Sequence, residues 1–368
     1  MGITRVRERI LFPYSGNTFG GSDVSSLILV KALVARGLDV TVGLHEEGVL
    51  SEHLKALDLP WVALPQVVGG SGRVAHRGVW PLREFLRSNE ITIVHTNDRR
   101  MHVGWLIPAR LAGTAHVWHQ RTPLTSRRVN LYAGFAKRLV CISEYSRRAL
   151  SSSNQRRALL LANPIEASAT AAAVLEAKKK LVSGALDQGL RVVGFFSNWS
   201  ERKRPEFFVE VAGRIRAELG PSVKFAMFGE PRAALRNSVM SRVDSLGLKE
   251  SILVLGQKTP VEPWIAACDL VVAPARNEGF GRVLVEAMQL GTLVVASAHG
   301  GHLEIIRDGD NGFLFPVDDL GMAADKSLLA LTDGERAKSI RNKAKSEAFE
   351  KYSVQAHVEG MVAVYRSI

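Results

Sequence analysis

Short apolar runs alternate with longer amphipathic stretches through the N-terminal half of the chain. The runs are rich in Val, Ile and Leu, and the stretches between them repeat apolar residues at helical spacing. Buried strands that alternate with helices form a parallel sheet covered on both faces, so this half predicts a Rossmann-like domain. The expected strands are 9–15, 39–44, 61–64, 91–97, 115–120 and 138–143, and the expected helices are 23–36, 49–57, 79–87, 102–112 and 129–135.

The alternation starts again after residues 167–190, which are rich in Ala, Lys and Ser and which we interpret as an interdomain connection plus a helix. The fold class is therefore α/β, with two doubly wound domains at 1–166 and 167–352 and a closing segment at 353–368. Open sheets of this kind bind ligands beyond the carboxyl ends of their strands. The expected strands here are 191–197, 223–229, 251–256, 269–275 and 292–298, with helices at 205–219, 233–246, 261–267 and 283–290.

Length and composition fit this organisation. The 368 residues suffice for about two domains, and 46% hydrophobic with 23% charged residues is typical of a globular protein. Cys141 and Cys268 each lie in an apolar segment, which indicates buried thiols in a reducing compartment. The first ten residues lack the apolar region of a signal peptide, and no run approaches the ~18 apolar residues of a membrane span. We therefore expect a cytoplasmic protein.

The net charge of +12 calls for an anionic partner or a solvated basic surface. One candidate is an anionic acceptor, and another is peripheral contact with the anionic inner face of a membrane. Nucleic acid is not expected, because no binding motif accompanies the charge and aromatic residues are not interleaved with it. Between 121 and 157 a single acidic residue, Glu144, stands among nine basic ones: Arg121, Arg127, Arg128, Lys137, Arg138, Arg147, Arg148, Arg156 and Arg157.

The segment 275–315 carries the strongest candidate chemistry. Glu278 and Glu286 are separated by seven residues, and Gly279 and Gly281 follow the first of them. An apolar run precedes the glycines and a helical pattern follows, so the glycines fall at a strand-to-helix turn. Such a turn offers backbone N–H groups and the positive end of a helix dipole to a phosphate. Both carboxylates are placed to face one ligand from different depths.

This segment resembles the donor site of the family-4 retaining glycosyltransferases, with their motif EGFGxVxxEAMAxGxPVVAxxxGGxxEII. One departure is Leu293, where the family has proline after Thr292. The resemblance implies a GT-B fold, with two domains that face each other across a cleft and a closing helix that returns to the first domain. The matching residues are Glu278, Gly279, Phe280, Gly281, Glu286, Ala287, Met288, Gly291, 294–296, Gly300, Gly301 and 304–306.

The resemblance also implies an activity. A sugar would pass from a nucleotide diphosphate, with UDP favoured over GDP, to a hydroxyl of a glycan, a lipid-linked acceptor or a small molecule. Cell-surface polysaccharide or glycolipid assembly would be the setting. No cofactor and no metal are expected. Glu286 would hydrogen-bond the ribose, Glu278 would lie near the transferred sugar, and the amides of Gly279, Phe280 and Gly281 would help to hold the diphosphate.

Two further stretches are candidates for phosphate binding. Gly20 and Gly21 precede a helix and resemble the family's early glycine loop, although a simple turn is the alternative. Lys203 matches a family lysine that reaches the diphosphate. Asn198 stands where the family has arginine, and Asn donates a hydrogen bond without charge. The site is therefore either less cationic, or Arg202 or Arg204 compensates.

His119 ends the strand 115–120 and matches the family's histidine near the donor sugar and acceptor. A structural histidine is the alternative, and His95 ranks second. The pairs His116/His119 and His299/His302 have the same spacing, and in a strand an offset of three puts side chains on opposite faces. That spacing argues against a zinc pair.

Four other classes of function are alternatives to a glycosyltransferase. A glycoside hydrolase would place its two carboxylates on opposite sides of the substrate, whereas here both lie on one turn and helix. An NAD-dependent oxidoreductase is remote, since no GxGxxG follows a strand. A nucleotide-sugar 2-epimerase of the same architecture and a non-catalytic nucleotide- or glycan-binding protein remain open.

Overall fold

The computed structural model describes residues 8–65, 76–123, 126–182, 189–231 and 233–368. The chain forms two compact units, one of residues Met1–Pro164 and Val354–Ile368, called unit 1, and one of residues Ile165–Ser353, called unit 2. The predicted boundaries after 166 and 352 therefore differ from the observed ones by two residues and by one. Most of the N-terminal residues used to argue against a signal peptide lie outside the described ranges.

Unit 1 is built on a seven-stranded sheet with the order β3-β2-β1-β4-β5-β6-β7, and every pair in it is parallel. The strand order reverses between β1 and β4, and that crevice is where doubly wound sheets bind ligands. The strands are β1 (Arg9–Tyr14), β2 (Asp39–Leu44), β3 (Trp61–Ala63), β4 (Ile93–Thr96), β5 (Ala115–Gln120), β6 (Arg138–Cys141) and β7 (Ala158–Leu160).

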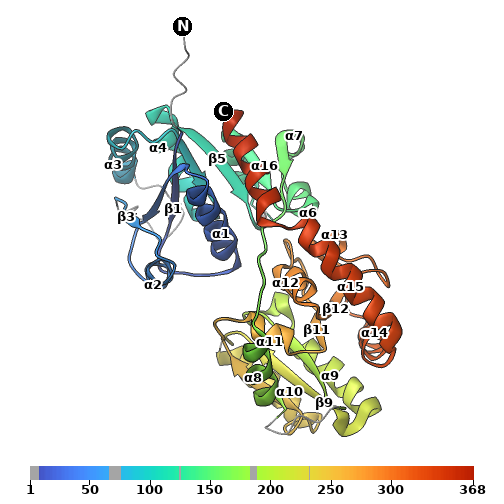
Figure 1. The fold of residues 1–368 in the computed structure, drawn as a ribbon. Helices are drawn as coiled ribbons and strands as arrows, with labels where there is room; N and C mark the ends of the chain where they lie inside the picture. Colours follow the sequence, from blue (N-terminus) through green and yellow to red (C-terminus); the bar gives the residue numbers. More distant parts are fainter. Residues whose placement is uncertain (1–7, 66–75, 124–125, 183–188, 232) are drawn as a thin grey trace. The chain divides into compact units, whose positions relative to one another are not determined.

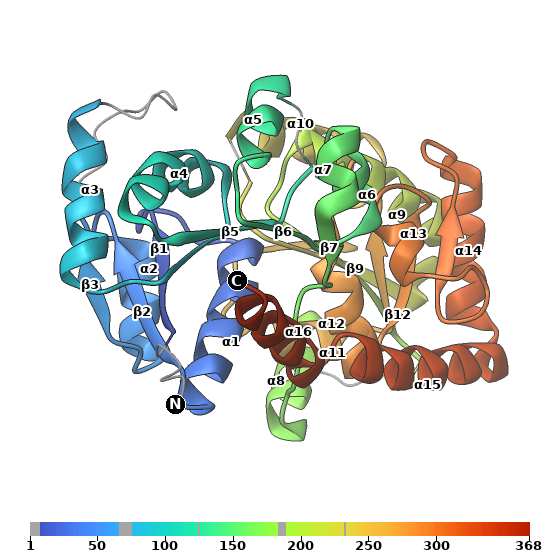
Figure 2. The same ribbon diagram turned by 90° about the horizontal axis from the view of Figure 1, so that it is seen from above.

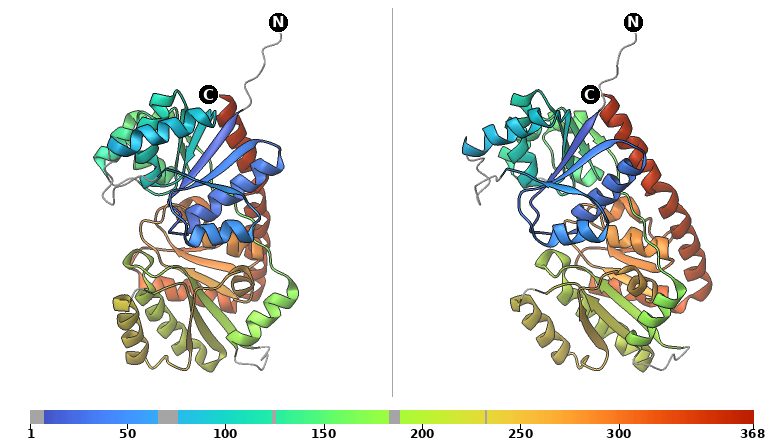
Figure 3. Two further views of the ribbon diagram at one scale, coloured as in Figure 1. Left: turned by 90° about the vertical axis from the view of Figure 1, so that its left-hand side faces the viewer. Right: turned by 60° about the vertical axis from the view of Figure 1, so that its left-hand side comes forward.

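Helices cover both faces of this sheet because its strands alternate buried side chains between two apolar clusters (Figures 1 and 3). Ile10 and Phe12 of β1 pack with α1 and the last helix, α16, whereas Leu11 packs with α3 and α4. Figure 2 shows α1 and α16 side by side. The helices are α1 (Gly21–Ala35), α2 (Val49–Ala56), α3 (His76–Ser88), α4 (Arg99–Ala112), α5 (Arg127–Ala133), α6 (Glu144–Arg148), α7 (Ser152–Arg157) and α16 (Val354–Arg366).

Unit 2 repeats the plan with a six-stranded parallel sheet in the order β10-β9-β8-β11-β12-β13. Its order reverses between β8 and β11, so this unit also has a switch point. The two sheets confirm the predicted pair of Rossmann-like domains. The strands are β8 (Arg191–Phe196), β9 (Val223–Phe228), β10 (Ile252–Gly256), β11 (Leu270–Ala273), β12 (Leu293–Ser297) and β13 (Phe313–Phe315).

One face of this sheet carries a large aromatic and aliphatic core beneath α9, α10 and α14. Helices α8, α11, α12 and α15 pack in series on the other side (Figures 1 and 2). The helices of unit 2 are α8 (Ala171–Leu181), η1 (Glu201–Lys203), α9 (Pro205–Leu219), η2 (Gly220–Ser222), α10 (Ala233–Ser245), α11 (Glu262–Ala266), α12 (Arg282–Leu290), α13 (His302–Ile305), α14 (Leu320–Thr332) and α15 (Gly334–Lys351).

Helices α4 and α5 begin earlier than predicted, because a polar side chain before the apolar pattern caps each of them. The Asp98 carboxylate accepts from the N–H groups of Arg100 and Met101, so α4 begins at Arg99 rather than at 102. Both cysteines are buried free thiols, as expected. In the described part of the chain, no helix combines the length and the apolar character needed to cross a bilayer.

Candidate active site

The loops after β8 and β11 meet at the switch point of unit 2. Strands β8 and β11 are hydrogen-bonded neighbours, so residues that follow them share one edge of the sheet. Lys203 ends the short η1 helix after β8, and Glu278 follows β11. A backbone hydrogen bond of 2.8 Å from Arg276 to Arg202 joins the two loops. The topology therefore brings together side chains that are 75 residues apart in sequence.

Two cations hold the Glu278 carboxylate. Lys203 Nζ lies 2.5 Å and Arg202 Nη1 2.7 Å from the same oxygen, Glu278 Oε2. The side chain of Glu278 is 14% exposed and that of Lys203 21%. Burial by itself would raise the pKa of Glu278, but the charges of Lys203 and Arg202 outweigh it and lower that pKa to about 2. Glu278 is therefore an anion at neutral pH and is not a proton donor there.

Close backbone contacts explain the paired glycines later in the motif. Gly301 N–H donates to the Glu278 carbonyl at 2.9 Å. A Cβ at Gly301 would lie 2.5 Å from the Phe280 carbonyl oxygen, and one at Gly300 would lie 2.4 Å from that of Glu278. Gly281 has φ of 105°, and a Cβ there would lie 2.9 Å from the buried His302 ring. Because glycine has no Cβ, the backbone of the loop after β12 can pack in direct contact with the turn at Glu278.

The other motif residues have partners inside unit 2. Glu286 lies on α12, one turn from Arg282, whose guanidinium donates to it at 2.7 Å. The Phe280 side chain is 5% exposed, and its ring meets that of Tyr352 edge-on with centroids 5.5 Å apart. Phe280 therefore anchors the turn by its side chain and leaves only its backbone for a ligand.

The structure shows which residue can replace the arginine that the family has at the position of Asn198. Asn198 is exposed, and its Oδ1 accepts from Glu230 N–H at 3.4 Å. Arg204 turns away toward Asp318, 2.6 Å distant, and toward the Pro274 carbonyl. Of the two arginines proposed to compensate for Asn198, Arg202 is the one that contacts Glu278 beside Lys203.

Gly20 and Gly21 lie at the start of α1, beyond β1 of unit 1. The Asp23 carboxylate accepts from Gly20 N–H at 2.9 Å and thus occupies the end of this helix. Burial raises the pKa of Asp23 to about 6. The sequence interpretation overlooked this acid, although Asp three positions after a helix-capping residue is a recognisable signal. A phosphate at this turn has to compete with Asp23.

His119 lies in a buried polar cluster at the ends of β4 and β5. His95 Nε2 lies 3.2 Å from His119 Nδ1, and Arg121 Nη2 lies 3.4 Å from the same nitrogen. Arg121 also donates to the side-chain oxygens of Asn97, at 2.9 Å, and of Asn163. The His357 ring of α16 stacks on that of His119 with centroids 5.7 Å apart.

Burial keeps these imidazoles neutral. It is the main cause that lowers the pKa values of His95, His119 and His357, and the charge of Arg121 lowers them further. His119 and His95 are fully buried. Three buried nitrogens around Arg121 have no hydrogen-bond partner among the described residues: His119 Nε2, His357 Nε2 and Asn97 Nδ2. A buried polar group costs free energy unless it forms a hydrogen bond, here with a ligand or with water.

The prediction that His116 and His119 point to opposite faces of their strand is confirmed. His116 Nε2 lies 2.8 Å from Thr96 Oγ1, which in turn contacts His102 of α4, whereas His119 contacts His95 and α16. The same argument was wrong for His299 and His302, since His299 lies in a loop and His302 begins α13.

The basic stretch is less uniform than its composition suggested. The sequence places Arg121 in a stretch predicted to form a basic surface, but Arg121 is 4% exposed and donates to the cluster described above. Arg147 and Arg148 pair with Glu144, and Arg138 bonds to Ser367. Arg127 and Arg128 of α5 are exposed.

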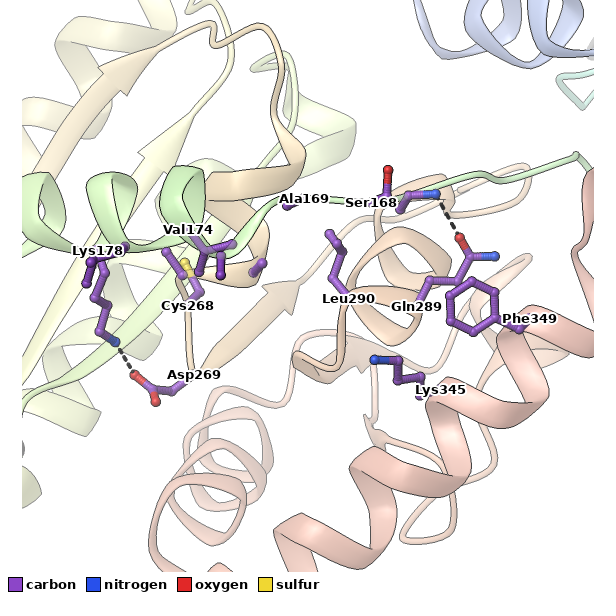
Figure 4. Close-up of a pocket in the computed structure, with 15 residues that line it drawn as sticks. Ser168, Ala169, Val174, Lys178, Cys268, Asp269, Gln289, Leu290, Lys345 and Phe349 are labelled. Carbon is purple, nitrogen blue, oxygen red and sulfur yellow. Dashed lines mark hydrogen bonds and ion pairs between the residues drawn. The ribbon is translucent and has the colours of Figure 1, made fainter.

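A groove of about 670 Å³ in unit 2 lies among α8, α12 and α15 (Figure 4). Lys178, Gln289 and Phe349 are among its lining residues, and Gln289 accepts from Ala167 N–H at 3.0 Å. None of the predicted site residues lines it. Among the residues with described positions, no group of three or more His, Cys, Asp or Glu side chains is arranged to hold a metal ion.

Comparison with known families accounts for both units. Residues 19–167 match the family described as Glycosyltransferase Family 4, and residues 177–347 match Glycosyl transferases group 1. The chain therefore belongs to the glycosyltransferases that these two family models describe.

Individual relatives share a quarter to a third of their aligned residues with this chain. A lipopolysaccharide core biosynthesis mannosyltransferase of Rhizobium meliloti is 30% identical over 52% of this chain and 55% of its own length. An N-acetyl-alpha-D-glucosaminyl L-malate synthase of Bacillus anthracis is 25% identical over 50% of this chain and 47% of its own length. The chain thus aligns with about half the length of these curated relatives.

Among solved structures, Anabaena HepE in complex with UDP and glucose superposes with a TM-score of 0.85. It is 21% identical, and the match covers 98% of this chain and 100% of that one. The same protein has been solved with UDP-glucose. At this identity the likeness establishes the fold, which is GT-B as expected.

Proposed function

We propose that this protein is a retaining glycosyltransferase that moves a sugar from a nucleotide diphosphate to an acceptor hydroxyl. The observation that carries the proposal is the contact of Lys203 and Arg202 with Glu278 at the switch point of unit 2. Two cations beside buried glycine amides match the chemistry of a departing diphosphate, which develops negative charge. The HepE complexes with UDP and UDP-glucose favour UDP as the carrier.

In this proposal Glu278 neutralises part of the positive charge of Lys203 and Arg202 until the donor arrives. The donor's phosphates take over Lys203 and Arg202, and the released carboxylate is then free to orient a sugar hydroxyl. The bond from the anomeric carbon to the diphosphate oxygen breaks and leaves its electron pair on the diphosphate. The acceptor oxygen bonds to the anomeric carbon, and its proton passes to the departing phosphate.

Unit 1 would hold most of the acceptor and supply His119. Its Nε2 is a buried nitrogen without a partner in the described chain, and a sugar hydroxyl beside it would satisfy it. Because His119 is fully buried, the side chains around it must move to admit that hydroxyl. Glu286, held by Arg282, would bind the ribose.

A thermal-shift panel of UDP, GDP, ADP and their sugars is the first test. A selective nucleotide at a concentration of 100 Kd stabilises the fold by about 2.7 kcal/mol. We expect UDP and UDP-sugars to raise Tm. No response to any nucleotide would contradict the proposal.

A second assay separates the alternative functions. The preferred donor is incubated with and without acceptors, and the anomeric configuration of the product is determined by NMR. Transfer with the configuration retained supports the proposal. An epimer formed from the donor alone would indicate a 2-epimerase, and binding without turnover of any donor would indicate a binding protein.

We also propose that α5 contacts an anionic membrane, as in glycolipid or surface-polysaccharide assembly at the inner face of a membrane. Leu131 of α5 is 65% exposed, and Phe135, two residues after the helix, is 56% exposed. Arg127 and Arg128 at the start of the helix are exposed as well. Exposed apolar side chains beside cations bind anionic bilayers and release them in salt. Sedimentation with phosphatidylglycerol vesicles should be weakened by Leu131→Ser with Phe135→Ser. Equal binding to neutral vesicles would contradict the proposal.

A further inference from the structure

A chain of buried hydrogen-bonding groups leads from the last helix to His119. Tyr365, near the end of α16, is 1% exposed, and its hydroxyl lies 2.5 Å from His95 Nδ1. His95 Nε2 lies 3.2 Å from His119 Nδ1. The residues Tyr365 and His95 are 270 positions apart in sequence, and no motif links them. All three side chains belong to unit 1.

The hydrogen-bond donors along this series of contacts determine which ring nitrogen of each histidine carries its proton. A guanidinium only donates, so the contact from Arg121 Nη2 makes His119 Nδ1 an acceptor. A neutral imidazole carries one N–H, and His119 must then carry it on Nε2. His95 Nε2 faces the same acceptor nitrogen and therefore donates to it. His95 Nδ1 is left to accept, and the Tyr365 hydroxyl is its donor.

The surroundings support this direction. Burial, helped by the charge of Arg121, holds the pKa values of His95 and His119 well below the usual range, so both rings are neutral. Burial also keeps the Tyr365 hydroxyl protonated by raising its pKa. The reverse direction would place a His119 Nδ1–H against an Arg121 N–H, where two donors would face each other.

We propose that Tyr365 and His95 are positioning residues that hold His119 as its Nε2–H tautomer, so that the nitrogen without a protein partner is a donor. The role of that donor toward a sugar hydroxyl rests on the proposed function. The tautomer itself does not. The last helix would thus contribute to the active site through Tyr365, and both Tyr365 and His95 would act through His119.

The tautomer is read directly by long-range ¹H–¹⁵N correlation on full-length protein with ¹⁵N-labelled histidine, with His119 assigned from the spectrum of His119→Gln. In the wild-type protein we expect the pattern of Nε2–H. In Tyr365→Phe, His95 loses its donor and can take either tautomer. Only the long contact of 3.4 Å from Arg121 Nη2 then holds His119 Nδ1 as an acceptor, so we expect His119 to show a mixture of both tautomers. Tyr14→Phe is the matched control, because Tyr14 is equally buried and its hydroxyl contacts Ser26 at 2.5 Å.

An Nδ1–H or imidazolium pattern in the wild-type protein would overturn the proposal. So would an unchanged Nε2–H pattern in Tyr365→Phe. The wild-type spectrum decides the first point even if the variant fails to fold.

Kinetics give a second readout. With a donor identified, Tyr365→Phe should lower kcat about fivefold with donor KM nearly unchanged, as expected for one lost hydrogen bond in the transition state. Tyr14→Phe should leave kcat unchanged. If no donor is turned over, the proposed function fails while the tautomer remains measurable. If turnover is normal in Tyr365→Phe, only the positioning role is overturned.

Discussion

Beyond β8 and β11 of unit 2 lie charged groups that are partly exposed, whereas beyond β4 and β5 of unit 1 lie neutral rings and amides that are buried. In unit 2, Lys203 and Arg202 share Glu278. In unit 1, His95, His119 and Asn97 gather around a buried Arg121. The first site lies at the switch point of its sheet, between β8 and β11, whereas the second lies one strand beyond the switch point of its own sheet, which is between β1 and β4. Both sites lie at the carboxyl ends of parallel strands, and the side chains at those ends set the chemistry of each site.

The contrast suggests a division of roles. Exposed cations next to glycine amides suit a diphosphate that enters from water and leaves with extra charge. Neutral buried donors suit uncharged sugar hydroxyls. A buried N–H without a hydrogen bond costs free energy, and a sugar hydroxyl that accepts from it removes that cost. Changes in unit 2 should therefore act on diphosphate binding and departure, and changes in unit 1 should act on orientation or on stability.

Lys203→Ala should give the largest effect, because it removes the cation closest to Glu278. We expect kcat/KM for the donor to fall about 10²- to 10³-fold, measured by release of the nucleoside diphosphate. Lys178→Ala is the matched control: Lys178 pairs with Asp269 at 3.0 Å and has 24% of its side chain exposed, against 21% for Lys203. Equal losses in the two variants would remove any special role for Lys203.

Glu278→Gln should affect binding and turnover in opposite directions. Without the carboxylate, Lys203 and Arg202 are free for phosphate, and we expect UDP to bind about tenfold more tightly in calorimetric titrations. The loss of an orienting group should lower kcat about 10- to 100-fold. Weaker UDP binding would show that Glu278 and the diphosphate do not compete for the two cations.

Arg202→Ala and Asn198→Arg test the departure from the family pattern. Arg202 already contacts Glu278, so its loss should raise donor KM about fivefold, which is roughly the value of one partly exposed charged hydrogen bond. Restoring arginine at exposed Asn198 should change KM by less than about twofold. If Asn198→Arg instead gave a large gain, Arg202 would not occupy the missing arginine's role.

Asp23→Asn should give the smallest effect, and it is on stability. The pKa of Asp23 is raised to about 6 in the fold, against about 3.9 in an unfolded chain. Proton binding therefore favours the fold fully below about pH 4, and this contribution is lost as pH rises through 6. The ionised acid destabilises the fold at pH 7.5, so Asp23→Asn should raise the unfolding free energy by about 1 kcal/mol there.

Urea unfolding at pH 7.5 and at pH 4 measures this difference, which should vanish at the lower pH. Asp319→Asn is the control, because Asp319 caps α14 as an exposed carboxylate. A gain at both pH values would show that the charge of Asp23 is not the cause. Tighter UDP binding in Asp23→Asn would further support a phosphate near Gly20.

Much of the fold follows from local pattern. The apolar runs at 9–15 and 269–275 contain β1 and β11, and the helices at 205–219 and 283–290 were placed to within one residue. The elements α6, α7, β7, α13, α14, α15 and β13 were not predicted. Buried Ala and Ser stand among the core positions of α14 and α15, and β13 has only three residues, so their hydrophobic patterns are weak.

The sequence by itself determined that this chain forms two α/β domains and that the turn at Glu278 to Gly281 joins a strand to a helix. Periodicity and glycine spacing are local properties, and they act whatever the rest of the chain does. It could not determine that Arg202 rather than Arg204 meets Glu278, that Arg121 is buried, or that Tyr365 reaches His95. Those contacts exist because β8 lies beside β11 and because α16 packs with α1 and the sheet of unit 1. Only the tertiary structure sets which distant segments become neighbours.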